Sequence, residues 1–109
     1  MYKLNGREYG CPVEAVSNFL GKKWVAQIIC VIGNRQKHFS ELKRSLEGCS
    51  TKMLSQQLKM LQELGIVENN KEILENNEVR SLYYLTEKGK TILPILEKII
   101  SWGDKNLEA

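Results

Sequence analysis

A stretch in the middle of the chain carries hydrogen-bond donors at helical spacing. The sequence TKMLSQQLKMLQEL, residues 51–64, places its long or hydroxyl-bearing donors on one side of a helix. Lys neutralises phosphate and Gln pairs with adenine through two hydrogen bonds, so such a stripe suits contacts to a nucleic acid. A face that only solvates the helix has the same composition, and the stripe alone leaves both interpretations open. The donors are Lys52, Ser55, Gln56 and Lys59, with Thr51 beside them.

The sequence marks both ends of this helix and its buried side. Ser50 can accept hydrogen bonds from the first-turn backbone N–H groups, and Gly65 stands where a left-handed C-terminal cap needs a residue without a Cβ. Leu54, Leu58 and Leu61 follow one another at helical spacing on a different side from the donors. We therefore expect one stripe to pack and the other to project.

The composition indicates one compact domain over residues 1–109. The chain is 42% hydrophobic and 27% charged, which fits an ordinary core. It contains no run of about 18 apolar residues and no apolar stretch resembling a signal peptide near its start, so we expect a cytoplasmic protein without a membrane span.

The charge is unevenly distributed. Residues 22–60 hold eight basic and two acidic side chains, a balance of +6, whereas residues 61–109 hold six basic and nine acidic ones, a balance of −3. A concentrated positive field favours approach to a polyanion, because condensed counterions are released. The basic excess surrounds the donor-bearing helix and favours the nucleic-acid interpretation.

Hydrophobic periodicity predicts four helices, then a β-hairpin and a closing helix. The last segment holds more apolar surface than a chain of this size easily covers, so we expect part of it to pack against a second subunit. Pro94 should kink or split this segment. The helices are expected over 13–20, 23–32, after a Ser40 cap, over 51–64 and after a Thr86 cap, and the strands over 66–73 and 79–85, with a turn at 75–77.

This order describes a winged helix-turn-helix. A short helix, a tight turn and a helix with a donor-rich outer face form the helix-turn-helix, and the hairpin behind them forms the wing. The expected fold class is α+β, mainly α, with additional N-terminal and C-terminal helices that mediate dimerisation.

Three ordered blocks resemble the HxlR-type winged helix-turn-helix transcriptional regulators. They are CPVEAVSNFLGKKW at 11–24, HFSELKRSLEGCSTKMLSQQLKMLQELGIVE at 38–68 and YYLTEKGKTILPILEKIISWG at 83–103. The resemblance implies a homodimer whose recognition helices, roughly 34 Å apart, read a palindromic operator in double-stranded DNA. It also implies that Thr51, Lys52, Ser55, Gln56 and Lys59 contact DNA, supported by Ser40, Lys43 and Arg44.

The wing departs from the family pattern. Relatives commonly carry prolines in the hairpin loop, whereas this chain has KEILENNEVR, with glutamates that phosphate repels. Lys71 and Arg80 are the expected wing contacts.

The cysteines suggest chemistry only through the resemblance. In some relatives a cysteine at the position of Cys11 senses electrophiles or oxidants, and a thiolate before a helix is stabilised by the helix dipole. Cys49 is a second redox candidate, Cys30 is expected in the core, and a purely structural Cys11 stays an open alternative. Three widely spaced cysteines and a lone His38 fit neither a disulfide framework nor a metal site, and we expect no cofactor.

The alternative function is a winged-helix protein-interaction module that does not bind DNA. An enzyme is not expected, because the chain has no C-x-x-C pair for a thiol oxidoreductase. The sequence leaves open the operator, the target genes, the inducing signal and the choice between repression and activation.

Overall fold

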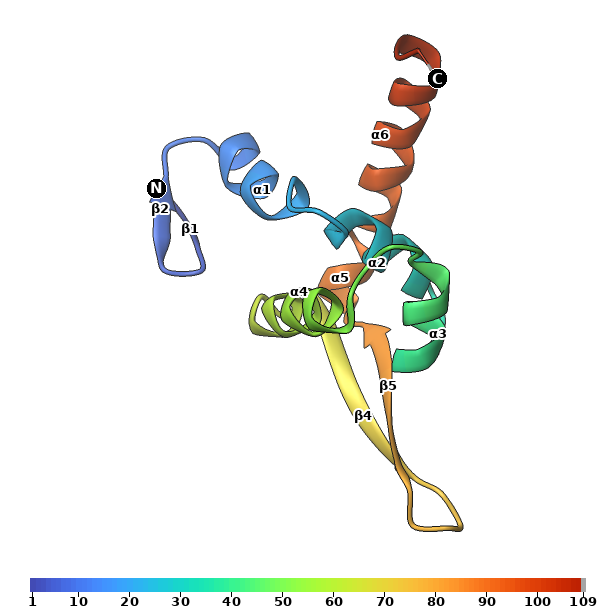
Figure 1. Cartoon of the computed structure of the whole chain (residues 1–109). Helices are drawn as coiled ribbons and strands as arrows, with labels where there is room; N and C mark the ends of the chain where they lie inside the picture. The colour runs from blue at the N-terminus through green and yellow to red at the C-terminus, as the bar shows by residue number, and fades with distance from the viewer. Residues whose placement is uncertain (109) are drawn as a thin grey trace.

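The protein is described by a computed structural model that covers residues 1–108 (Figure 1). It is an α+β structure dominated by helices, as predicted, and includes two small antiparallel sheets with strand orders β1-β2 and β3-β5-β4. The helices are α1 (Pro12–Leu20), α2 (Val25–Ile32), α3 (Phe39–Ser45), α4 (Thr51–Glu63), α5 (Glu87–Lys90) and α6 (Leu93–Asn106). The strands are β1 (Tyr2–Leu4), β2 (Arg7–Tyr9), β3 (Lys37–His38), β4 (Val67–Ile73) and β5 (Val79–Leu85).

Helix α2 lies at the centre of the core, as its apolar sequence predicts. Val25, Ile28, Ile29 and Ile32 are buried and pack with the inner faces of α3, α4, β4 and β5. The expected burial of Cys30 is wrong, because its side of α2 is exposed. A helix that is apolar over most of its surface is buried on most sides, and here one side stays open.

Helices α3 and α4 form the helix-turn-helix. The Ser50 hydroxyl accepts a hydrogen bond from the Met53 N–H at 3.0 Å, which confirms the predicted cap of α4. The predicted Ser40 cap of α3 is wrong: the helix begins at Phe39, and His38 is the cap residue. The Glu41 carboxylate accepts a 3.0 Å hydrogen bond from the His38 backbone N–H. His38, and not Ser40, therefore caps the start of α3.

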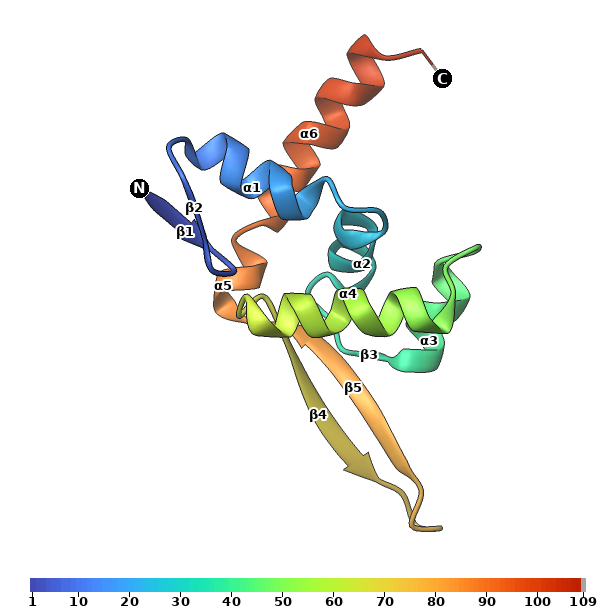
Figure 2. The ribbon, with the colours of Figure 1, turned by 60° about the vertical axis from the view of Figure 1, so that its left-hand side comes forward.

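The wing is the β4–β5 hairpin, which projects from the body below α4 in both ribbon views (Figure 2). Its register runs from Val67 opposite Leu85 to Ile73 opposite Val79. Both strands agree with the prediction to within one residue. Asn77 has φ 66° in the turn, a left-handed conformation that Asn tolerates.

A short hairpin at the N-terminus was not predicted. Strands β1 and β2 are joined by Asn5 and Gly6, which have φ of 51° and 81°, as a type I′ turn requires. Leu4 packs against the core and Tyr9 is buried. We call this hairpin, residues 2–9, the N-terminal arm.

The C-terminal segment divides into α5 and α6, and Pro94 lies in the first turn of α6, so the predicted split is confirmed. The start of α5 is tied to the end of α4. The Thr86 hydroxyl donates to the Gly65 carbonyl at 2.6 Å, and Lys88 Nζ donates to the Leu64 carbonyl at 2.9 Å. A Cβ at Gly89 would lie 2.2 Å from the Ile66 carbonyl oxygen, so glycine permits this close approach.

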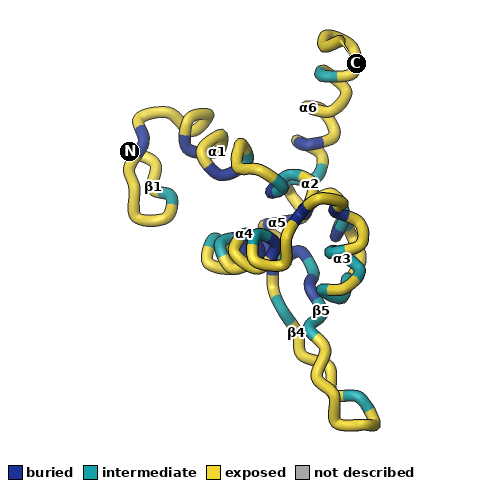
Figure 3. The backbone as a smooth tube through the Cα atoms, viewed as in Figure 1, coloured by how far each residue is buried: buried dark blue, intermediate teal, exposed yellow. Residues whose placement is uncertain are grey.

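Helices α1 and α6 leave apolar side chains exposed, and Figure 3 colours most of the projecting α6 as exposed. Ile99 is 55% and Trp102 62% exposed. A groove of about 420 Å³ lies between the two helices. Its apolar lining comprises Val13, Val16, Leu20, Ile95 and Ile99.

Within residues 1–108, no single helix is long and apolar enough to cross a membrane. Helices α1 and α2 reach that length and composition only as a pair, with a bend of 80° between them.

Candidate nucleic-acid interface

Helix α4 separates an apolar face from a polar face. Leu54, Leu58 and Leu61 are at most 1% exposed, because they face the core. All five predicted donors project into solvent from the remaining surface of the helix. The exposed donors are Thr51, Lys52, Ser55, Gln56 and Lys59.

Helix α3 and the wing form a cleft of about 760 Å³. The structure brings Ser40 and Arg44 of α3 together with Arg80 of β5 in its lining. Lys43 does not line the cleft and is half-buried, so the structure separates it from this group. The two guanidinium groups give the cleft the charge and donor geometry that suit phosphate oxygens.

The carboxylate of Glu41 also lines this cleft, beside Ser40 and Arg44 on the same helix. The hydrogen bond from the His38 backbone N–H lowers the pKa of Glu41, and the charges of Lys37, His38 and Arg44 lower it further. The carboxylate therefore stays ionised at neutral pH.

The two predicted wing contacts lie on opposite faces of the hairpin. Lys71 pairs with Ser81 and Glu72 pairs with Arg80 in the register, and neighbouring residues of a strand alternate between faces. The Glu72 carboxylate lies 3.8 Å from His38 Nε2.

The base of the wing carries a second polar contact. The Tyr84 hydroxyl donates to the Glu68 carboxylate at 2.6 Å, and this hydrogen bond raises the pKa of Tyr84. The pair joins the two wing strands where they leave the body.

A second cleft, of about 480 Å³, borders α4 on the side of the N-terminal arm. Asn5 and Lys22 line it together with Gln56 and Lys59 of α4. Sequence reasoning did not place Asn5 and Lys22 beside α4. The Asn-Gly pair signals the turn, but only the tertiary fold places that turn beside α4.

Comparison with known proteins identifies the family of this scaffold. The sequence pattern described as HxlR-like helix-turn-helix matches residues 19–109. The chain belongs to the HxlR-like family. An HTH-type transcriptional regulator of Methanothermobacter thermautotrophicus is 35% identical over 96 residues, which cover 88% of this chain and 72% of the relative.

Two similar proteins of known structure are a transcriptional regulator in its reduced form and a redox regulator in its oxidised form. The transcriptional regulator YodB of Bacillus subtilis is 34% identical over 99 residues, covering 90% of this chain and 87% of YodB. Its reduced form matches with a TM-score of 0.76 over 92% of this chain and 97% of that chain. The redox regulator HypR in its oxidised form matches with a TM-score of 0.79 and 30% identity over 91% of this chain and all of HypR. This HxlR-like chain is thus a DNA-binding transcriptional regulator.

The three cysteines of this HxlR-like protein occupy different environments. Cys11 is exposed at the cap position of α1, directly before Pro12. Cys49 is 1% exposed in the core, and its thiol donates to the Ser50 carbonyl at 3.7 Å. Partial burial raises the pKa of Cys30, and the charge of Glu97 raises it further, so Cys30 is a neutral thiol at neutral pH.

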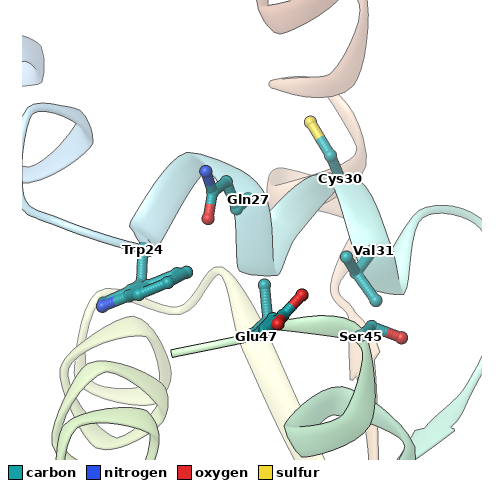
Figure 4. A pocket seen from close by; sticks show the side chains of 7 residues that line it. Trp24, Gln27, Cys30, Val31, Ser45 and Glu47 are labelled. Carbon is teal, nitrogen blue, oxygen red and sulfur yellow. The ribbon is translucent and has the colours of Figure 1, made fainter. Parts of the chain in front are cut away.

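Trp24 borders a surface cavity of about 470 Å³ between α2 and α3 (Figure 4). Its ring is half-buried against the core and lies close to Gly48, as expected of a packing residue. Lys23 Nζ is 5.5 Å from the ring centroid, within the range of a cation–π contact. The described residues 1–108 contain no group of three His, Cys, Asp or Glu side chains placed to hold a metal ion.

Proposed function

We propose that this regulator is a homodimer that binds a palindromic operator, with α4 of each protomer in the major groove. The observation that carries the proposal is the face of α4. Its leucines fix the helix to the core while its donors, Thr51 and Ser55 among them, stand free in solvent. Gln56 and Ser55 approach base edges, and Lys52 and Lys59 bind phosphates.

The supporting contacts come from α3 and the wing. Ser40 and Arg44 bind the phosphate backbone beside the groove, and Arg80 joins them from the opposite wall of the cleft. Lys43, which lies outside the cleft, binds phosphate separately from this group. Lys71 contacts DNA from the other face of the wing. The acidic tip holds the end of the wing away from phosphates, so the wing contributes less than α4.

The apolar groove between α1 and α6 binds a second copy of the chain. Ile95 and Ile99 of α6 line this groove with Val13 and Val16 of α1, and Trp102 is exposed further along α6. Burying these side chains removes a large apolar surface from water. The twofold arrangement then holds two α4 helices at the spacing of one DNA turn.

Cys11 provides a switch that responds to an oxidant or an electrophile such as a quinone. The HxlR-like relative YodB is known both in a diamide-treated and in a quinone-bound form. Here Cys11 is exposed beside α1, which forms part of the dimer groove. A bond between Cys11 and Cys49 of the other protomer would require Cys49 to leave the core, so modification of Cys11 alone is the simpler switch.

Selection from a random DNA pool tests the operator proposal. The wild type should enrich a palindrome, and Gln56→Ala should relax the preference at one position of each half-site, costing about 1–3 kcal/mol there. Lys59→Ala should lower the affinity for all DNA sequences alike and make the salt dependence of that affinity shallower. Equal enrichment of the same palindrome by both variants at undiminished affinity would refute the assignment of this face.

The same measurements separate DNA binding from a protein-interaction module. Neutralising several phosphates makes affinity fall steeply with salt, whereas an apolar protein interface lacks this dependence. For the switch, operator affinity of the wild type should change after treatment with diamide or a quinone, and Cys11→Ser should not respond. A wild type that is indifferent to both reagents would remove Cys11 from the mechanism.

A further inference from the structure

The N-terminal arm is held against the body at a defined place. Leu4 packs on the core and Tyr9 is 8% exposed, so both strands are anchored by apolar side chains. The turn at Asn5 and Gly6 points toward α4 in both ribbon views (Figures 1 and 2). Because the arm is already anchored, its turn can bind a ligand without a further loss of conformational entropy.

The turn shares a cleft with a lysine and with the donor face of α4. Lys22 lies in the loop after α1, and that loop is fixed because Gln57 Nε2 donates to the Lys23 carbonyl at 3.2 Å. Lys22 and Lys59 both line the cleft, and Glu63 is its one acidic lining residue. The cleft therefore has a net positive charge and opens beside the donors that face DNA.

The arm and the wing lie on opposite sides of α4, the arm above it and the wing below it in both views. The major groove is about 12 Å wide and is bordered by a phosphate backbone on each rim. If α4 occupies the groove, a structure on each side of the helix faces a different rim. The wing faces one rim and the arm faces the other.

We propose that the turn of the N-terminal arm and Lys22 form a second backbone-binding site, which takes a DNA phosphate on the rim opposite the wing. The inference rests on the proposed function, because α4 must enter the groove to bring that rim near. Lys22 supplies the charge and the Asn5 amide supplies a hydrogen-bond donor. Lys3 lies 3.9 Å from Glu8 within the arm, so its charge is balanced there.

Lys22→Ala tests the charge contribution by the salt dependence of operator binding. Each lost phosphate contact reduces the slope of log affinity against log salt by about 0.9, hence by about 1.8 for a dimer. With 1 M salt as the reference at which the two affinities are equal, a slope change of about 1.8 corresponds at 0.1 M salt to a loss of about 60-fold in affinity, the same for all sequences. Lys98→Ala, the same change on the polar side of α6, is the matched control and should keep the wild-type slope.

Asn5→Asp tests the turn itself. Asp tolerates the left-handed backbone of Asn5, so the arm keeps its shape while an acid is placed against phosphate. Affinity should fall more than for Gln27→Glu, which makes the same neutral-to-acid change on an exposed site of α2. Hydroxyl-radical footprints should lose protection on the rim away from the wing and keep it on the wing side.

The outcomes distinguish this inference from the proposed function. If Lys22→Ala and Asn5→Asp match their controls while Lys59→Ala weakens binding, the arm is not a contact and α4 remains the reading helix. If Lys59→Ala and Gln56→Ala also bind like the wild type, the proposed function itself fails. A thermal unfolding midpoint equal to that of the wild type shows that each variant is folded.

Discussion

Helices α4 and α6 each leave one face uncovered, and the chemistry of the two faces differs. On α4 the uncovered side chains are donors and cations, whereas on α6 they are isoleucines and Trp102. Water already solvates the first face well, so only a partner with matching polar groups gains by binding there. The second face gains from any apolar cover. The difference teaches that exposure alone does not identify a partner, but the composition of the exposed face does.

The largest expected effect comes from placing a charge on the α6 face. Ile99→Asp would bury a carboxylate in the proposed dimer contact, so the protein should sediment as a monomer. Operator affinity should then fall by more than about 100-fold, because the two half-sites are no longer bound together. Ile73→Asp, on an exposed isoleucine of the wing, should keep the dimer mass. A dimeric Ile99→Asp protein would show that α6 is not the contact.

The inner side of α4 offers the next largest effect. Leu58 is 1% exposed, so Leu58→Ala leaves a cavity and should lower the free energy of unfolding by about 2–5 kcal/mol. Lys59→Ala, one residue further on the outer side, should change it by less than about 0.5 kcal/mol. Urea denaturation measures both. Comparable losses in the two variants would mean that the faces of α4 are not divided as described.

A smaller effect is expected at the start of α4. Ser50→Ala removes the side-chain cap on the Met53 N–H and should cost about 1 kcal/mol of stability. Ser55→Ala, on the solvent side of the same helix, should leave stability nearly unchanged while weakening DNA binding. The two variants distinguish a residue that stabilises the helix from a residue that is proposed to contact DNA. Equal urea midpoints for Ser50→Ala and Ser55→Ala would show that the Ser50 cap does not stabilise the fold.

The smallest effect concerns acid. The folded state lowers the pKa of Glu41, so its carboxylate stabilises the fold above the unfolded pKa, and this contribution is lost as pH falls through the lower folded pKa. Glu41→Gln should therefore flatten the fall in stability toward acid pH, measured by urea midpoints between neutral and strongly acid buffers. Glu47→Gln, on an exposed glutamate that follows α3, serves as the control. Identical acid profiles for Glu41→Gln and the wild type would contradict the role given to the His38 N–H.

Local patterns in the sequence predicted most of the fold, because each depends on neighbours in the chain. The Ser50 cap, the Thr86 cap and the split before α6 are decided within a few residues, and all three agree with the structure. Ser40 failed as a cap because His38 and Glu41 satisfy the helix start instead. The N-terminal arm was missed, since its strands have three residues each and give no periodic signal.

The candidate site was predictable only where one element carries it. The donor face of α4 follows from helical spacing alone. The positions of Arg44 against Arg80, and of Lys22 against Lys59, depend on how separate elements pack. Cys30 was predicted to be buried and is exposed. The apolar sequence of its helix does not indicate which side the rest of the fold leaves uncovered.

The close approach of Gly89 to the Ile66 carbonyl has a consequence for signalling. Together with the hydrogen bonds from Thr86 and Lys88, it couples the end of α4 to the helix pair that leads into α6 with little freedom between them. In the proposed dimer, a tilt of α6 against the other protomer would then be transmitted to α4 as a rigid-body movement. We expect an inducer to alter the distance between the two half-sites that the protein can span, while the base preference within each half-site stays constant.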